Sequence, residues 1–251
     1  MSEVKEVYFG VGSAYIKQVG AADGLRPLGE VDQFDLAYNQ TAIDLPNNRT
    51  LGGGILDTVF RIDSMEIALK MRNFSSDNFA LAEYGGHSAV IGATITDEEH
   101  DGYKERFIAT LYPGISVVTV ADAAGGGGTS FTEDLDFEVR SGGIYLLDTF
   151  TGVDGDPVFI TYTHPGVDVI QALIESGLEY EIFLDGMNEA LSGDPFTHDI
   201  YKVKLSPAQT LALLGGGQYG EMAITGKVLA DTSKTGAGIS KYMKSVKKTA
   251  V

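Results

Sequence analysis

The stretch from Leu178 to Asp231 limits the possible folds most strongly, because two of its segments alternate apolar and charged side chains. A period of two places the apolar residues of a strand on one face, so both segments are predicted strands with one buried face. A loop rich in Gly, Asn, Asp and Pro separates them. If they pair as an antiparallel hairpin, Lys202 and Lys204 lie near Glu179 and Glu181, and these charges fix the register.

The segment that follows carries the signals of a short helix. Ser206 is a good N-cap, Pro207 suits the first helical position and Gln209 completes a capping box, while the glycines at 215–217 end the segment. About nine residues are too few for a stable isolated helix, so we expect this helix to pack on a sheet. A last alternating strand, which contains Glu221, follows the glycines.

The composition favours strands and turns over helices. The 251 residues include 32 glycines and only 7 prolines, and β-branched and aromatic residues are abundant. A chain of this length buries a sizeable core, so we predict a mainly β protein with short helices, an α+β fold. We expect a single domain over residues 1–231 and a basic C-terminal arm over residues 232–251.

The sequence also restricts the cellular setting and the class of ligand. With no cysteines, neither a disulfide framework nor a thiolate metal site is possible. The N-terminus lacks the pattern of a signal peptide, and no apolar segment is long enough to span a bilayer. We therefore expect a cytosol-like setting without membrane insertion. The net charge of −17 argues against nucleic-acid recognition through phosphates, which depends on Lys and Arg.

The charge is unevenly distributed along the chain. Five of the 18 basic residues follow Asp231, with no acidic residue among them: Lys234, Lys241, Lys244, Lys247 and Lys248. Residues 1–231 therefore contain 13 basic and 35 acidic residues, a net charge of −22. We expect the basic arm to be mobile and to order only on a neighbour, and residues 1–6 to form a flexible arm.

The N-terminal third contains the longest strand signals. Residues 32–41 alternate as in a half-buried strand, and residues 58–72 form a longer one whose apolar side chains change parity near Asp63, which predicts a β-bulge. A short helix is expected at 79–84, after several N-cap candidates.

The connection at 42–57 combines turn residues with scattered apolar ones: Ile43, Leu45, Leu51, Ile55 and Leu56. A solvated loop does not need such side chains. We interpret the segment as a loop or extended hairpin that either docks on another surface or folds back on its own domain.

The residue pattern changes at 113–165, where short apolar runs are separated by Gly-rich or Asp-rich turns. We interpret them as a β-rich insert or a set of elaborated hairpins. Further strands are expected at 88–96 and 106–112, on either side of an acidic, solvated hairpin tip at 97–101.

No motif supports a catalytic, cofactor or metal site. The glycines at 125–128 lack the lysine of a phosphate loop, and the acidic residues at 154–156 lack the spacing of a calcium loop. The carboxylates clustered at 97–101 could bind a hard cation, but a solvated hairpin tip is the preferred interpretation. The four histidines are dispersed, and no serine lies in a nucleophile elbow. We therefore predict a protein that is not an enzyme and that uses no cofactor or metal.

Two stretches resemble the major tail tube proteins of long non-contractile-tailed (siphovirus-type) bacteriophages. In the C-terminal stretch, a strand ends in a Gly-x-Asn turn at Gly186. An Asp-led Tyr-Lys-Val-Lys strand follows at 199–204, then a Ser-Pro helix start and a final strand that ends in Leu-x-Asp at 229–231. In the N-terminal stretch, the long strand is followed by a helix start at Asn73. The resemblance covers about residues 55–90 and 175–231 well.

The resemblance implies a tail-tube β-sandwich or barrel fold. Six subunits would form a ring, their inner sheets would join into one barrel, and the rings would stack into a tube that conducts phage DNA without binding it specifically. An acidic lumen would repel phosphates, and the candidate lumen-facing residues are Glu66, Glu179, Glu181 and Glu221.

The same resemblance assigns contacts and partners. Residues 42–57 would reach an adjacent ring, the insert would lie outside the tube, and the terminal arms would bridge subunits through Lys241, Lys244, Lys247 and Lys248. Tape-measure, tail terminator and distal tail proteins would be the partners, and the protein would assemble in the cytoplasm of a bacterial host and reside in the virion tail.

Two other functions compete with this one. The inner tube protein of a contractile injection machine would share the fold and the ring. An acidic β-rich carbohydrate-active module is the second alternative, and the absence of Trp makes an aromatic sugar platform less favourable.

Overall fold

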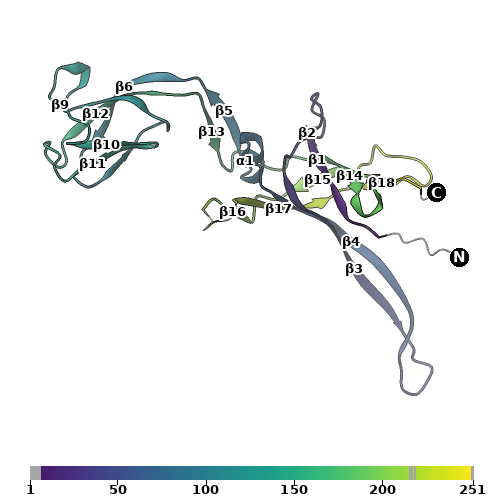
Figure 1. The fold of residues 1–251 in the computed structure, drawn as a ribbon. Coiled ribbons are helices and arrows are strands. Elements are labelled where there is room, and N and C mark those ends of the chain that lie inside the picture. The colour runs from purple at the N-terminus through teal and green to yellow at the C-terminus, as the bar shows by residue number, and fades with distance from the viewer. Residues whose placement is uncertain (1–6, 215–216, 218, 250–251) are drawn as a thin grey trace. The chain divides into compact units, whose positions relative to one another are not determined.

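The computed structural model describes residues 7–214, 217 and 219–249. The chain is mainly β, as predicted, and it divides into two compact units (Figure 1). Unit 1 comprises the residues up to Gly86 and those from Ile170 onward, and unit 2 comprises His87–Val169. Unit 2 therefore includes the expected insert at 113–165 and begins earlier. The expected flexible arm at 1–6 lies outside the described residues.

Unit 1 is built on one sheet of nine strands in the order β2-β1-β14-β15-β17-β4-β3, with β16 paired to β17 and β18 paired to β15. Its strands are β1 (Gly10–Gln18), β2 (Arg26–Pro27), β3 (Val31–Pro46), β4 (Ile55–Met71), β14 (Tyr180–Asn188), β15 (Asp194–Leu205), β16 (Thr210–Ala212), β17 (Glu221–Val228) and β18 (Met243–Lys247). Its helical segments are α1 (Ser76–Ala82) and the 3₁₀ turn η2 (Glu189–Leu191).

The core of unit 1 covers one face of this sheet. Alternate residues of the central strands are buried, such as Ile67 and Leu69 on β4 and Met222 and Ile224 on β17. Helix α1 packs on the same core, and the Ser75 side chain caps it by accepting a hydrogen bond from a backbone N–H of its first turn. The helix predicted at 79–84 therefore exists but begins earlier.

The predicted hairpin of β14 and β15 is confirmed as an antiparallel pair. Lys202 contacts Glu179, with 2.9 Å between Nζ and Oε2. Glu181 instead contacts Lys17 of β1, at 3.8 Å. A bulge between the register pairs at Tyr180 and Ile182 explains the difference, because it shifts the side chains of β15 relative to those of β14.

The predicted bulge near Asp63 is also present. In the β3–β4 pair Asn39 lies opposite Ser64 and Gln40 lies opposite Ile62, so Asp63 is the extra residue. Beyond it the two strands continue as a long hairpin that extends past the other strands of unit 1 (Figure 1). The segment at 42–57 is thus an extended hairpin rather than an irregular loop.

The prediction of a helix after Ser206 is wrong. Residues Thr210–Ala212 form β16 on β17, and the Ser206 hydroxyl donates to the Thr225 carbonyl at 2.9 Å instead of capping a helix. The Gln209 N–H likewise donates to Ala223 O at 2.9 Å. The open edge of β17 satisfies these backbone groups more completely than a two-turn helix would, because a short helix leaves its terminal groups unpaired. Two of the expected terminating glycines, 215 and 216, lie outside the described residues.

The C-terminal arm is also different from the prediction, since β18 orders on its own chain. β17 pairs with residues 203–205 of β15, and β18 pairs with residues 196–200 in the same direction. Between them, Leu229 N–H donates to Lys202 O and Tyr201 N–H donates to Tyr242 O. The chain therefore leaves the sheet after β17 and returns as β18, which lies on the same side of β15 as β17 does.

Unit 2 consists of short strands in two sheets with a separate core. One sheet has the order β10-β11-β7 and the other β6-β12-β8-β9, while β5 and β13 pair at the point where the chain enters and leaves the unit. The strands are β5 (Gly86–Val90), β6 (Ala93–Asp101), β7 (Phe107–Ala109), β8 (Ser116–Ala121), β9 (Ser130–Phe131), β10 (Phe137–Arg140), β11 (Gly143–Leu146), β12 (Pro157–His164) and β13 (Val167–Gln171), with the 3₁₀ turn η1 (Ala124–Gly126).

The acidic segment at 97–101 is not the predicted hairpin tip but part of β6, paired with β12. Glu98 turns toward the interior, where it accepts hydrogen bonds from the Tyr162 hydroxyl at 2.6 Å and from Leu111 N–H at 3.0 Å. Burial and the bond to Glu98 raise the pKa of Tyr162 to about 12. The acidic segment that predicts a solvated turn therefore provides, through Glu98, a hydrogen-bonded connection between strands of unit 2.

Candidate functional site

The residues predicted for the lumen, for the inter-ring contact and for the inter-subunit arm lie on or near three surfaces of unit 1. These are the polar face of the large sheet, the distal β3–β4 hairpin and a pocket lined by segments near both termini. We define "the arm" as the hairpin residues 39–62, beyond the Asp63 bulge. We define "the terminal pocket" as the cavity lined by Val7 and Tyr8, by residues of β15 and by residues 245–248.

The polar face of the large sheet contains the candidate lumen glutamates. Glu66, Glu181 and Glu221 lie on strands whose neighbouring residues are buried in the core, so their side chains point to the opposite face. Glu179 directly precedes β14. The structure thus brings the four candidates to one side of one sheet.

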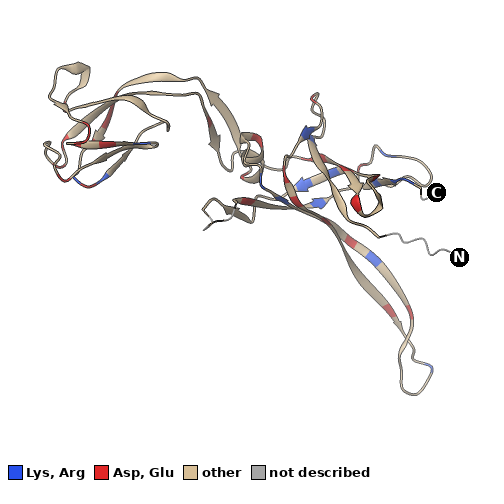
Figure 2. Cartoon of the chain, viewed as in Figure 1, with Lys and Arg blue, Asp and Glu red and all other residues tan. Residues whose placement is uncertain are grey.

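Lysines accompany these glutamates, and the face is not strongly acidic. Glu221 contacts Lys70 at 3.5 Å, and the partners of Glu179 and Glu181 are Lys202 and Lys17. Across the central strands, Lys204 lies opposite Lys227, and Lys227 lies opposite Glu66. Figure 2 shows this mixture of both signs on the strands of unit 1. The sequence-based argument for an acidic surface therefore does not hold for this face.

Most of the excess acidic charge lies in unit 2. Residues 87–169 contain 14 acidic and three basic residues, a net charge of −11, while the remaining residues contain 21 acidic and 15 basic ones, a net charge of −6. The division could not be read from the net charge of the chain, because it requires the boundaries of the two units. Unit 1, which contains the sheet with the candidate lumen glutamates, is the less acidic of the two units.

The arm exposes a dense set of apolar side chains. All five predicted contact residues are at least half exposed: Ile43, Leu45, Leu51, Ile55 and Leu56. Three further residues of β4, missed by sequence reasoning, are also exposed: Val59, Phe60 and Ile62. The parity change at Asp63 was the signal that could have identified them, because apolar residues beyond the bulge no longer point into the core.

Apolar side chains lie on both faces of the arm. Ile43 is the register partner of Val59, and Ala42 is the register partner of Phe60. Since successive residues of a strand point to opposite faces, neither face of this two-stranded element is polar throughout. Isolated hairpins of this kind are marginally stable in water.

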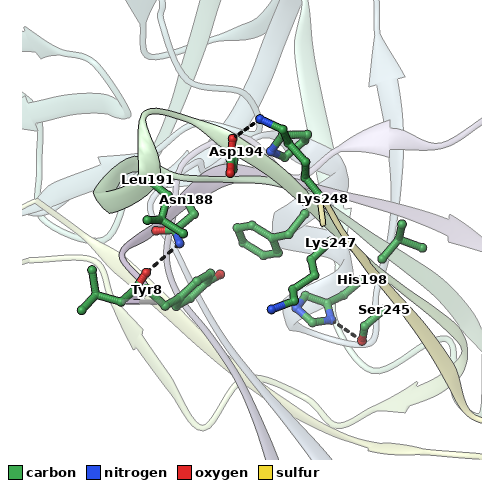
Figure 3. Close-up of a pocket in the computed structure, with 12 residues that line it drawn as sticks. Tyr8, Asn188, Leu191, Asp194, His198, Ser245, Lys247 and Lys248 are labelled. Atoms are coloured by element: carbon green, nitrogen blue, oxygen red, sulfur yellow. Dashed lines mark hydrogen bonds and ion pairs between the residues drawn. The ribbon is translucent and has the colours of Figure 1, made fainter. Parts of the chain in front are cut away.

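The terminal pocket has a volume of about 270 Å³ and a mainly apolar lining (Figure 3). Phe196 of β15 is 8% exposed and contacts the ring of Tyr8 edge-on, with 5.0 Å between centroids. Gly186 is required beneath it, because a Cβ at this position would lie 2.3 Å from the Phe196 ring. The Phe196 ring, which forms the floor of the pocket, is thus held between Tyr8 and Gly186.

Hydrogen bonds hold the two chain segments that border the terminal pocket. The Asn188 side chain accepts from Phe9 N–H at 2.9 Å and donates to Val7 O at 2.8 Å. On the other side Lys248 contacts Asp194 at 2.6 Å. His198 Nδ1 lies 2.8 Å from the Ser245 hydroxyl, and burial lowers the pKa of His198 (Figure 3).

The lysines predicted for an inter-subunit arm lie on or beside β18. Lys244 and Lys247 belong to this strand, Lys248 follows it, and Lys241 precedes it, with its carbonyl accepting from Asp231 N–H. Burial raises the pKa of Asp199, and the positive charges of Lys234 and Lys244 oppose this rise. The basic segment therefore already balances acidic groups of its own chain, while its role between subunits stays a prediction.

Other sequence candidates are scattered. Within the described ranges, no three His, Cys, Asp or Glu side chains come together as a group that could hold a metal ion. His164 is buried beside Tyr112, with ring centroids 4.4 Å apart, and Gly125 lies in the η1 turn. Across those same ranges no helix has the length and hydrophobicity needed to cross a membrane.

Comparison with known proteins gives a family but no activity. The model of a family described as "Protein of unknown function UCP028589" matches residues 7–246, nearly the whole chain. No curated protein matches the sequence.

Proposed function

We propose that this chain, which belongs to the UCP028589 family of proteins of unknown function, is the major tube subunit of a long non-contractile phage tail. Six copies form a ring, rings stack into a tube, and DNA passes through the tube during infection. The subunit resides in the virion tail and assembles in the bacterial cytoplasm with tape-measure, terminator and distal tail proteins.

The single observation that carries this proposal is the apolar arm. Ile55, Phe60 and Ile62 are each about 60% exposed, and burying apolar surface stabilises an assembly by about 25 cal/mol per Å². Monomeric proteins rarely expose contiguous apolar patches of more than a few hundred Å². An element of this kind favours a self-assembling structural subunit over an enzyme or a small ligand-binding module.

The polar face of the large sheet supports the same function. A sheet with one buried and one solvated face suits the wall of a wide, water-filled barrel made by several chains. Because ion pairs balance three of its glutamates, this face would neither attract the phosphates strongly nor repel them strongly. The proposed lumen is therefore a mixed-charge wall, with weak net interaction with passing DNA.

Negative-stain electron microscopy of the concentrated protein, together with light scattering, tests the proposal. The expected result is rings or hollow tubes of uniform width. A double variant of a cross-strand pair on the arm, Ile43→Asp with Val59→Asp, should abolish tubes. The control is Val117→Asp with Val153→Asp, because both valines are exposed in unit 2; this variant should assemble normally.

A monomer would contradict the proposal only together with a second result, because tails often need an initiating complex. The protein is therefore also tested for incorporation into tails in a complementation assay with a phage that lacks its own tube protein. A chain that stays monomeric and does not enter tails is not a tube subunit.

A further inference from the structure

We propose that a cavity in unit 2 binds an organic cation, namely a protonated primary amine on an aliphatic stem. The cavity has a volume of about 310 Å³, and its lining includes Asp122, Phe131, Phe150 and Asp156. We call it the unit 2 cavity. It lies wholly within one unit, so this inference does not rest on the proposed tube function. Two sources carry the ligand group: a free alkylamine and a lysine side chain of a partner protein.

Two phenylalanine rings form the apolar part of the unit 2 cavity. Phe150 is 1% exposed and lies against the ring of Phe131 on β9, with 4.6 Å between the ring centroids. Gly152 brings the backbone close to this pair, because a Cβ at this position would lie 2.4 Å from the Phe150 ring. Phe131 is only half-buried, so part of its ring remains open to a ligand. The face of an aromatic ring is negative and attracts a cation that lies over it.

Two carboxylates lie at the same cavity. Asp122 follows β8 and Asp156 precedes β12, and these strand ends are neighbours because Ala121 is the register partner of Phe159. Thr129 N–H donates to Oδ1 of Asp122 at 2.6 Å and so holds this carboxylate in place. In the part of the chain that the structure describes, no Lys or Arg forms an ion pair with either carboxylate. Both are therefore available to a cation from outside.

The hydrogen-bonding groups around the cavity favour a ligand that donates. Thr151 uses both its N–H and its hydroxyl on the buried carboxylate of Asp136. Asp156 N–H donates to Val153 O at 3.1 Å. These donors are engaged, whereas an ionised aspartate at the cavity can only accept. An ammonium group, which has three donors and no acceptor, is the complement of such a lining.

Other ligand classes fit this lining less well. Ca²⁺ takes about six to eight oxygen ligands, yet within the described ranges no three His, Cys, Asp or Glu side chains come together as a metal-binding group. An anion would meet two carboxylates in a unit with a net charge of −11. A sugar hydroxyl both donates and accepts, so a sugar would also need free donors. An aliphatic amine places its charge beside the carboxylates and its stem on the rings.

The charge of the whole unit contributes an attraction that is not specific to the cavity. Unit 2 contains 14 acidic and three basic residues, so every cation is concentrated around it at low salt. A cavity site differs from this general attraction because it depends on two particular carboxylates and one ring pair. Variants at the cavity are therefore compared with variants that remove the same charge elsewhere in unit 2.

Saturation-transfer NMR on the full-length protein tests the proposal, because it detects the small probe whether the protein is monomeric or assembled. The probes are pentylamine, its neutral analogue pentanol and its anionic analogue pentanoate. The expected result is that pentylamine binds at least about tenfold more tightly than pentanol and that pentanoate does not bind. Equal affinities for pentylamine and pentanol would overturn the proposal.

Paired variants locate the binding. Asp122→Asn with Asp156→Asn should weaken pentylamine binding at least about tenfold and change pentanol binding less than about twofold. The matched control is Glu99→Gln with Asp148→Asn, two exposed carboxylates of unit 2 outside the cavity lining, and it should bind as the unaltered protein does. Phe131→Leu should weaken the amine more than the alcohol, because it keeps apolar volume but removes the ring. Equal weakening in the two double variants would overturn the cavity as the site.

A salt series on the unaltered protein keeps the test decisive if a variant does not fold, which circular dichroism shows. Raising the salt from about 0.02 M to about 0.5 M shortens the range of electrostatic attraction. Pentylamine binding should weaken along this series, while pentanol binding should not. Pentylamine binding that is unchanged by salt would contradict recognition of its charge.

A peptide probe separates the two sources of the amine. Binding of acetyl-Gly-Lys-Gly-amide, lost when the lysine amine is acetylated, identifies a lysine side chain of a partner protein. Binding of pentylamine without binding of the peptide identifies a free amine. If neither probe binds, the proposed site is wrong, and the tube function is unaffected because its own test uses assembly.

Discussion

The carboxylate of Asp136 illustrates how a single polar residue organises unit 2. It is 3% exposed and accepts hydrogen bonds from Thr132 N–H and from the N–H and hydroxyl of Thr151, each at 2.8 Å. Burial alone would raise the pKa of Asp136, but these bonds outweigh burial and hold the pKa below its usual value. The charged form therefore connects the turn before β10 to the segment that follows β11.

We expect Asp136→Asn to destabilise the protein by about 1.5–3 kcal/mol at pH 7, because an amide cannot accept three hydrogen bonds as a carboxylate does. Since the folded-state pKa is depressed, the contribution of the charge is present above the unfolded-state pKa and is lost as the pH falls through the folded-state pKa. Urea unfolding followed by circular dichroism at pH 7 and pH 3 measures both effects.

The control for this substitution is Asp134→Asn, at an exposed turn residue with φ of 66° that Asn also tolerates. Its stability should change little at either pH. Equal losses in the two variants, or a loss for Asp136→Asn that does not shrink at pH 3, would contradict the role of the buried charge.

Among the elements, those with a strict period of two were predictable and those that depend on a distant edge were not. The alternation in β14, β15 and β17 follows from their own side chains, and the parity change located the Asp63 bulge. The segment after Ser206 has good capping residues, but its structure is decided by the edge of β17, which lies later in the chain. Local propensity is a weak prior when such an edge is available.

Strand β18 provides a prediction at this scale. Deleting residues 241–251 should expose the edge of β15 at residues 196–200, while residues 203–205 keep their partner β17. Hydrogen exchange should therefore lose protection in the first part of the strand and keep it in the second, which serves as an internal control. Uniform loss across β15, or unchanged protection throughout, would show that β18 does not pair as described.

At the scale of the whole molecule, the net charge does not show that the two units differ in charge. The resemblance to tail tube proteins implies an acidic lumen, yet the large sheet pairs its glutamates with lysines, and −11 of the net charge of −17 belongs to unit 2. The candidate site was predictable where it depended on exposed apolar residues in one segment, as in the arm. The terminal pocket was not, because it combines residues from positions 7–8, 188–198 and 245–248.

Unit 2 should fold without the rest of the chain. It has its own core, in which Ile144, Leu146, Ile160 and Tyr162 are fully buried. A protein consisting of residues 87–169 is expected to unfold cooperatively, and its midpoint in urea should rise with added salt, because salt screens the repulsion among its acidic groups. The control is the full-length chain, whose unit 1 is less acidic. Gradual, non-cooperative unfolding would contradict this prediction.

The paired strands β5 and β13 have a practical consequence for engineering. They carry the chain into unit 2 and out again side by side, so the two crossing points lie about 5 Å apart, the usual spacing of neighbouring strands. A foreign domain whose own ends lie close together could replace residues 91–166 without stretching this ribbon. In the proposed tube, such a replacement would display chosen cargo at regular intervals, one copy on every subunit.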